Sequence, residues 1–339
     1  MITIIATIFV FGLLVLFHEL GHFTTAKLVG MRVDEFAIGF GPKIFSYKYG
    51  ETTYSLRIIP LGGYNKIAGM DPEEEAGDRG YSNKPIWARL IVISAGSVMN
   101  FILPVILFFM IFMTAGVDTP STDPILGNIM PDKPAAMAGL QPGDKIMKIN
   151  NEEIKSWKNF VEVIQVNSGK ILKVEYERGG QLNNASLIPE LDSKSNHGII
   201  GVTAGLNKYY PGVPESATMA VKHTAYIIGA MTEGLLQMFT GKASADVSGP
   251  IGVAKMTGEV AKLGLVPLLQ FASFLSINLG IINLLPLPAL DGGHIVTLLV
   301  EGIRRKPLSK KTIYYIQMAG FLLIISLMIF TTFNDIKNL

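Results

Sequence analysis

The stretch His18-Glu19-Leu20-Gly21-His22 follows an apolar run, Met1 to Phe17, in which no side chain is charged. Residues i and i+4 of a helix lie on one face, one turn apart, so the two imidazoles can hold a single Zn²⁺. The glutamate between them can take a proton from a water molecule at the metal. Charged groups are unfavourable in a membrane helix, by about 2.5–3.5 kcal/mol at its centre on the insertion scale. The setting therefore favours a zinc site over a pair of packing histidines.

The composition indicates a membrane protein with some soluble mass attached. Of the 339 residues, 49% are hydrophobic and 17% are charged, whereas a soluble domain carries about 25% charged residues. The net charge of +2, without a basic arm, predicts no nucleic-acid partner. The chain has no cysteine, which excludes disulfides and cysteine ligands. A zinc site would therefore use histidine and carboxylate.

Four apolar segments are long enough to cross a bilayer, which takes about 20 residues. The loop 27–89 carries nine Lys or Arg, and the loop 301–312 carries five. By the positive-inside rule both loops are cytoplasmic, while the amino terminus, residues 118–265 and the tail lie outside. Ala217–Thr240 is a fifth candidate, but counting it as a span would move the second basic loop outside. It is predicted to be an amphipathic helix at the outer membrane surface, with a span as the alternative.

The segment between the first two spans predicts a small hairpin sheet. Val33–Tyr49 and Thr52–Leu61 are rich in β-branched and aromatic residues and are punctuated by glycine. Many of these side chains are apolar, although no soluble core lies nearby in the sequence. Such a sheet could enter the bilayer beside the first helix, where protein covers its backbone.

Residues 118–210 have the composition of a soluble domain. A short helical stretch, Pro134–Leu140, precedes a Gly-Asp turn, a strand, a helix at Ser156–Val166 and a strand at Ile171–Arg178. This order is typical of a bacterial PDZ domain, which captures peptides by adding a strand to a sheet edge. A generic α/β module is the alternative.

The predicted fold is an α-helical polytopic membrane protein with four transmembrane helices, a membrane-reentrant β-hairpin region and an extracytoplasmic PDZ domain. The expected boundaries are 1–30 for the first helix, 31–89 for the β region, 90–117 for the second helix, 118–210 for the PDZ domain, 211–265 for the interfacial helix and linker, 266–300 for the third helix, 301–312 for a cytoplasmic loop, 313–333 for the fourth helix and 334–339 for the tail.

A catalytic zinc needs a third protein ligand and an open position. Asp291 and His294 are the candidates inside the membrane. Counted back from the cytoplasmic ends of their helices at 1.5 Å per residue, Asp291 and His18 both lie ~14 Å deep. Asp291 is the preferred ligand because Pro286 and Pro288 break the helix just before it. His294 either supports the site or packs, and packing is preferred.

The chemistry that follows is hydrolysis of a peptide bond. Zinc on His18, His22 and Asp291 would lower the pKa of a bound water towards about 7. Glu19 would take its proton and later deliver it to the leaving amine. A transmembrane substrate has to unwind first, and an edge strand of the 33–61 hairpins could hold it by backbone hydrogen bonds.

Taken together, these features resemble the site-2 protease family of intramembrane zinc metalloproteases, in its bacterial RseP-type branch. The matching motifs cover nearly the whole chain and are Phe17-His-Glu-Leu-Gly-His22, Glu35-Phe-Ala-Ile-Gly-Phe-Gly-Pro-Lys43, Pro60-Leu-Gly-Gly-Tyr64, Ser248-Gly-Pro-Ile-Gly252 and Asn278-Leu-Gly-Ile-Ile-Asn-Leu-Leu-Pro-Leu-Pro-Ala-Leu-Asp-Gly-Gly-His294. The resemblance implies zinc ligation by His18, His22 and Asp291, with Glu19 as the catalytic acid and base.

Asn278 and Asn283 have two interpretations on the residues alone. They either make hydrogen bonds between helices or hold an extended substrate backbone near the metal. The resemblance implies the second, with Pro286 and Pro288 also handling substrate, and it implies the reentrant β-hairpin region. It further implies single-span membrane substrates in the bacterial inner membrane, such as anti-sigma factors after a first cut or remnant signal peptides.

The chain departs from the family pattern in two places. In Ala95-Gly-Ser-Val-Met-Asn100, Ser97 stands where the family usually has proline. We expect this to relax a kink, with little effect on the chemistry. There is also room for only one PDZ domain, where some relatives carry two in tandem.

Two other classes of function are compatible with the same features. A non-catalytic membrane adaptor would gather partners through its PDZ domain and would not need Glu19. A membrane-anchored protease for soluble peptides would cleave substrates that lack a transmembrane segment.

Overall fold

The computed structural model describes residues 1–71, 77–193, 195–242 and 249–337. The chain divides into two compact units. One combines Met1–Thr114 with Gly212–Leu339, and the other is Ala115–Pro211. Ser248, the first residue of one of the quoted motifs, lies outside the described residues.

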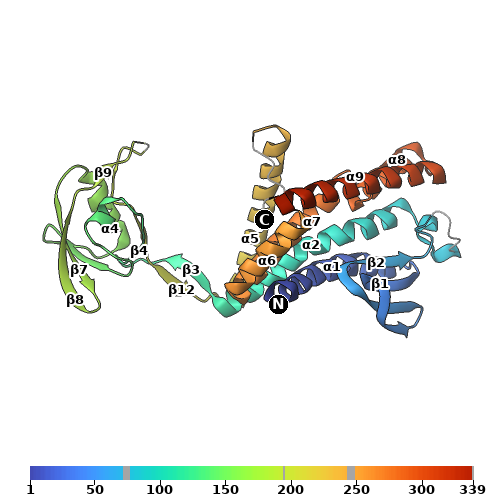
Figure 1. Ribbon diagram of the computed structural model, residues 1–339, viewed down its shortest axis with the longest axis horizontal. Coiled ribbons are helices and arrows are strands. Elements are labelled where there is room, and N and C mark those ends of the chain that lie inside the picture. Colours follow the sequence, from blue (N-terminus) through green and yellow to red (C-terminus); the bar gives the residue numbers. More distant parts are fainter. Residues whose placement is uncertain (72–76, 194, 243–248, 338–339) are drawn as a thin grey trace. The chain divides into compact units, whose positions relative to one another are not determined.

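Four helices among the described residues are long and apolar enough to cross a membrane. They are α1 (Ile2–Leu28), α2 (Ile86–Ala115), α7 (Leu265–Leu284) and α9 (Lys310–Lys337). This confirms the four-span helical architecture. The start of α1 and the end of α9 lie at one end of this unit, and the hairpin sheet lies at the other (Figure 1). The segment predicted as one helix over 266–300 is two helices, because α7 ends before the prolines and α8 (Asp291–Arg304) begins after them.

The helical unit buries polar side chains and exposes many apolar ones. Val10 of α1, Leu103 of α2 and Ala272 of α7 pack in its core. Ser97 and Asn100 are fully buried as well. The outward apolar side chains include Phe321, Leu322 and Leu323 on α9. An apolar exterior over a partly polar interior fits a bilayer environment, where backbone and side-chain polar groups find partners inside the protein.

Strands β1 (Val33–Tyr49) and β2 (Thr52–Ile67) form the predicted hairpin sheet, and both fold back on themselves. Residues 35–38 pair with 53–56 on one side, residues 33–38 pair with 63–67 on the other, and 43–49 pair with 52–57. Residues 63–67, called the edge segment below, therefore form one edge of the sheet. Strand β2 was predicted to end at Leu61, and this is wrong. The chain continues through Gly62, whose φ of +111° bends it without ending it.

Two further helices complete this unit. Helix α5 (Val213–Phe239) contains most of the segment predicted to lie at the membrane surface, and it crosses the direction of the candidate spans (Figure 1). It packs on α2, where the His223 ring lies 4.5 Å from that of Phe108. Helix α6 (Pro250–Lys262) is capped from α9, since Gly249 N and Gly252 N both donate to the carboxylate of Asp335 at 2.9 and 2.8 Å.

The unit Ala115–Pro211 has an ordinary apolar core, in which Ile146, Phe160 and Leu172 are buried. Its centre is a four-stranded antiparallel sheet in the order β6-β5-β7-β8. The elements are β3 (Val117–Pro120), β4 (Leu126–Ile129), α3 (Pro134–Met137), β5 (Lys145–Ile149), β6 (Glu152–Glu153), α4 (Trp157–Val166), β7 (Leu172–Arg178), β8 (Gln181–Leu187), β9 (Glu190–Leu191), β10 (Gly198–Ile199), β11 (Val202–Ala204) and β12 (Leu206–Tyr209). Short helix, strand, helix and strand follow one another in the order predicted for a PDZ domain.

Candidate metal centre

Helix α1 presents His18 and His22 on one face, one turn apart, and brings that face close to α2. Gly21 lies between them in sequence and is buried. A Cβ at Gly21 would lie 2.7 Å from the carbonyl carbon of Ala95 and 2.8 Å from Cγ of Met99. The two helices can therefore approach this closely only because Gly21 has no side chain.

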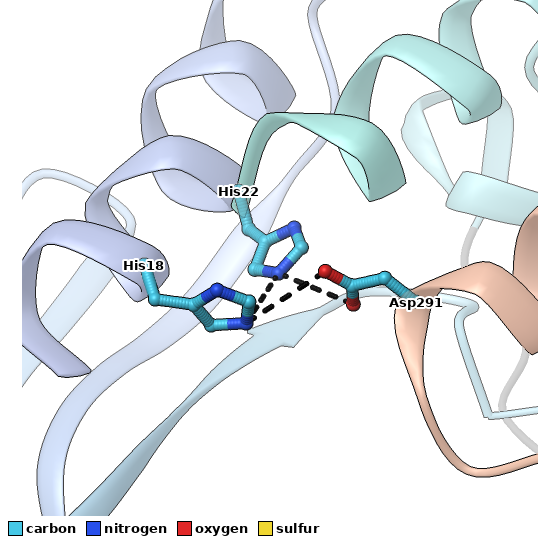
Figure 2. Close-up of side chains that lie close together, drawn as sticks. All are labelled: His18, His22 and Asp291. Atoms are coloured by element: carbon cyan, nitrogen blue, oxygen red, sulfur yellow. Dashed lines mark hydrogen bonds and ion pairs between the residues drawn. The ribbon is translucent and has the colours of Figure 1, made fainter. Parts of the chain in front are cut away.

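Asp291 reaches the same place from the opposite side, at the start of α8. The chain leaves α7 at Leu284, passes the two prolines, and turns at Ala289, whose φ is +70°. Gly292 and Gly293 then let α8 pack directly on this loop, because a Cβ at Gly293 would lie 2.9 Å from the carbonyl carbon of Leu287. The reversal of the chain directs the Asp291 carboxylate towards α1 (Figure 2).

The side chains of His18, His22 and Asp291 converge on one point (Figure 2). The two Nε2 atoms are 3.2 Å apart. Asp291 Oδ1 lies 3.6 Å from His22 Nε2, and Oδ2 lies 3.8 Å from His18 Nε2. Tetrahedral zinc with ligands at 2.0–2.1 Å would hold its donor atoms roughly 3.3–3.4 Å apart. The spacing and the chemistry of this donor set therefore fit zinc.

Helix α2 makes polar contacts with His22 and Asp291 and leaves room for both imidazole rings. His22 Nδ1 donates to the Val92 carbonyl oxygen at 2.8 Å, which leaves the Nε2 lone pair free for a metal. Ser97 Oγ donates to Asp291 Oδ2 at 3.1 Å. Gly96 leaves room for both rings, since a Cβ there would lie 2.6 Å from Cε1 of His22 and 2.7 Å from Cε1 of His18.

Glu19 faces the same cavity, of about 200 Å³, which the hairpin sheet closes on one side. Asn65 of the edge segment donates through Nδ2 to Glu19 Oε2 at 2.7 Å and to the Glu19 carbonyl oxygen at 2.8 Å. Gly63 approaches closely, because a Cβ there would lie 3.0 Å from Glu19 Cγ. The edge segment thus fixes the carboxylate beside the histidines.

The remaining predicted residues differ in whether they line this cavity. His294 lines the cavity, together with Ala289. Asn278 and Asn283 are half-buried on α7. The described residues that line the cavity do not include Asn278, Asn283, Pro286 or Pro288. A role for these four in handling substrate stays a prediction.

Sequence reasoning did not find the supporting residues Val92, Ser97, Asn100 and Asn65. The first three lie on α2, and Ser97 and Asn100 belong to the Ala95-Gly-Ser-Val-Met-Asn100 motif quoted from the sequence. The polar side chains of Ser97 and Asn100 in an otherwise apolar helix were the available signal, whereas Val92 takes part only through its backbone carbonyl. Asn65 carried no such signal, because its contact with Glu19 depends on the path of the edge segment.

A family model described as Peptidase family M50 matches residues 6–327. The chain belongs to this family. The regulator of sigma-W protease RasP of Bacillus subtilis is 34% identical over 418 residues, covering 99% of each protein. A putative zinc metalloprotease of Clostridium acetobutylicum is 38% identical over 335 residues, covering 98% of this chain and 97% of that protein. Among solved structures, the PDZ domain of an SdrC-like protein from Listeria monocytogenes is 28% identical with a TM-score of 0.23, covering 26% of this chain and 93% of that one.

Membership of family M50, together with the four candidate spans, makes this chain a zinc metalloprotease that acts within the membrane, as the sequence predicted. The alternative of a non-catalytic adaptor is not supported, because the match to a peptidase family runs through almost the whole chain.

Proposed function

We propose that the M50 peptidase cleaves the transmembrane segments of single-span membrane proteins at the point where His18, His22 and Asp291 converge. The observation that carries this proposal is the set of three donor atoms from two distant segments, all within 4.8 Å of one another. These residues would hold the zinc ion. Bound zinc supplies Lewis acidity, which polarises a peptide carbonyl and acidifies water at the site.

Glu19 is proposed as the general base and then the general acid. It shares the cavity with the three ligands. Because Asn65 donates to Oε2, we assign Oε1 as the oxygen that accepts the proton. The same carboxyl group then delivers the proton to the leaving amine.

The edge segment is proposed to hold the unwound substrate. Gly63, Tyr64 and Asn65 line the cavity, and they lie at an edge of the sheet. An extended substrate segment added there would run beside Glu19. The sequence placed this role in residues 33–61, whereas the pairing supports residues 63–67. Proline at Tyr64 should reduce cleavage strongly, and proline at Phe45, in the strand farthest from the cavity, should reduce it much less.

The substrates and orientation complete the proposal. Because one relative is named regulator of sigma-W protease, we propose membrane-bound regulators of sigma factors as the first class of substrate, such as anti-sigma factors after a first cut. Remnant signal peptides are the second class. We place the enzyme in the bacterial inner membrane, with the basic loops and the metal centre towards the cytoplasm and the PDZ domain outside. A peptide or substrate tail would be the ligand of that domain.

The test is cleavage of a single-span reporter co-expressed with the enzyme. Wild type should cleave it, and Glu19→Gln should lose about 10²–10⁴-fold in rate while keeping its zinc. Glu259→Gln, at an exposed position on α6, is the matched control and should cleave normally. Full cleavage by Glu19→Gln would contradict the proposal. Equal cleavage of a reporter without a transmembrane segment would favour the protease for soluble peptides instead.

A further inference from the structure

One short stretch of α2 supplies a polar partner to each of the three proposed ligands. Val92, Gly96 and Asn100 are spaced four residues apart, so they lie on one face of the helix, with Ser97 beside them. Val92 accepts from His22, Ser97 donates to Asp291, and His18 is contacted both by Asn100 and by the Gly96 backbone. The stretch is itself anchored, because Ser276 Oγ on α7 donates to the Asn100 carbonyl oxygen at 2.8 Å.

The contact between Asn100 and His18 is chemically incomplete as it stands. Asn100 Nδ2 lies 3.2 Å from His18 Nδ1, so two nitrogen atoms face each other. The other amide atom, Asn100 Oδ1, is buried without a hydrogen-bond partner among the described residues. The two ends of an asparagine amide have nearly the same shape, so their assignment follows from the hydrogen-bond network.

Rotating the amide by half a turn reverses the roles of the two side chains in this contact. Oδ1 then accepts from His18 Nδ1–H, while Nδ2 takes the place that Oδ1 held. With its proton on Nδ1, the neutral imidazole has its lone pair on Nε2, the atom that faces His22 and Asp291. In the opposite orientation the amide would donate to Nδ1, and the proton on Nε2 would block the metal. His22 already shows the required arrangement through Val92.

We infer that Asn100 is a positioning residue that accepts from His18 Nδ1–H through Oδ1 and so prepares His18 for the metal. Ser97 acts in the same way on Asp291, since its hydroxyl donates to Oδ2 and fixes the carboxylate orientation. The inference rests on the proposed ligand set. It also revises the expectation that Ser97, standing where the family usually has proline, has little bearing on the chemistry.

The test is the zinc affinity of the purified full-length protein in detergent, measured by competition with a chromogenic chelator. Asn100→Leu removes the acceptor and should weaken zinc binding about 10–100-fold. Asn100→Asp keeps an acceptor oxygen but has no amide donor, so it should bind within a few-fold of wild type. Ser97→Ala should weaken binding by less than Asn100→Leu. Ser273→Ala is the matched control, because that buried hydroxyl donates to Leu269 of its own helix, and its zinc affinity should be unchanged.

Two results would overturn the inference. One is wild-type affinity in Asn100→Leu. The other is a loss in Asn100→Asp as large as in Asn100→Leu, which would show that the amide donates. If Asn100→Leu does not fold, the zinc affinities of Asn100→Asp and Ser97→Ala still test the inference. Asp291→Asn, measured alongside, distinguishes a failure of the proposed ligand set from a failure of the positioning role. If that variant binds zinc like wild type, the proposed ligand set fails, whereas failure confined to position 100 overturns the positioning role alone.

Discussion

In the unit Ala115–Pro211 the fully buried side chains include Ile146, Phe160 and Leu172, and the buried Asp144 is paired with Arg178. In the helical unit Ser97, Asn100 and Ser276 are fully buried, while α9 exposes apolar side chains along much of its length. The difference follows from the solvent, since water rewards the burial of apolar surface and a bilayer does not. In the bilayer, polar groups gather where they can find partners, and Ser97 and Asn100 find theirs in Asp291 and His18.

The comparison predicts the largest effect for a core substitution in the smaller unit. Phe160→Ala should destabilise that unit by about 3–5 kcal/mol, because it removes a large apolar side chain and leaves a cavity. Zinc affinity should not change. Hydrogen exchange of residues 115–211 in the full-length protein measures the first effect, and chelator competition measures the second. A loss of zinc affinity that accompanies the loss of exchange protection would mean that the two units unfold together.

Gly96→Ala tests the opposite region by adding one methyl group instead of removing a ring. The new Cβ would meet the rings of His18 and His22, so zinc affinity should fall by about tenfold or more. Gly12→Ala is the control, because a Cβ at this position of α1 meets nothing within 4 Å. Unchanged zinc affinity in Gly96→Ala would show that the rings do not need the space on α2.

Ser276→Ala should have a smaller effect. It removes the hydrogen bond between α7 and the Asn100 carbonyl oxygen, and such interhelical bonds contribute about 0.6 kcal/mol in membranes. Reversible unfolding in bicelles can measure a loss of this size. A loss in the free energy of unfolding as large as that of Phe160→Ala would mean that the two interiors do not differ in this way.

The smallest effect is expected at the turn between β1 and β2, where the Glu51 side chain is partly exposed. Hydrogen bonds from Arg79 and Lys27 lower the pKa of Glu51 from 4.5 to about 2. A depressed pKa in the folded state stabilises the protein above pH 4.5, and this stabilisation disappears as the pH falls towards 2. Wild type should therefore melt slightly above Glu51→Gln at pH 6, and the difference should shrink at pH 3. A difference that does not depend on pH would contradict this account.

The sequence predicted most of what depends on composition and pattern. The four spans, the hairpin sheet and the pairing of His18 and His22 with Asp291 followed from apolar length, glycine spacing and depth in the membrane. It predicted a break at Pro286 and Pro288 but still counted 266–300 as one membrane helix, because the direction taken after Pro288 depends on the backbone at Ala289. It also missed the edge segment, because Gly62 bends β2 where punctuation by glycine suggested an end. Partners such as Asn65 and Asn100 depend on how elements pack, which a single sequence does not encode locally.

The most direct test of the central claim is X-ray absorption at the zinc edge of the purified wild-type protein and of Asp291→Asn. We predict one zinc per chain in the wild type, with two imidazole nitrogens and carboxylate oxygen at about 2.0–2.2 Å. Asp291→Asn should lose most of its zinc at a chelator concentration at which the wild type keeps its zinc. Wild-type zinc content in Asp291→Asn, or a spectrum with three imidazoles, would contradict the proposed site.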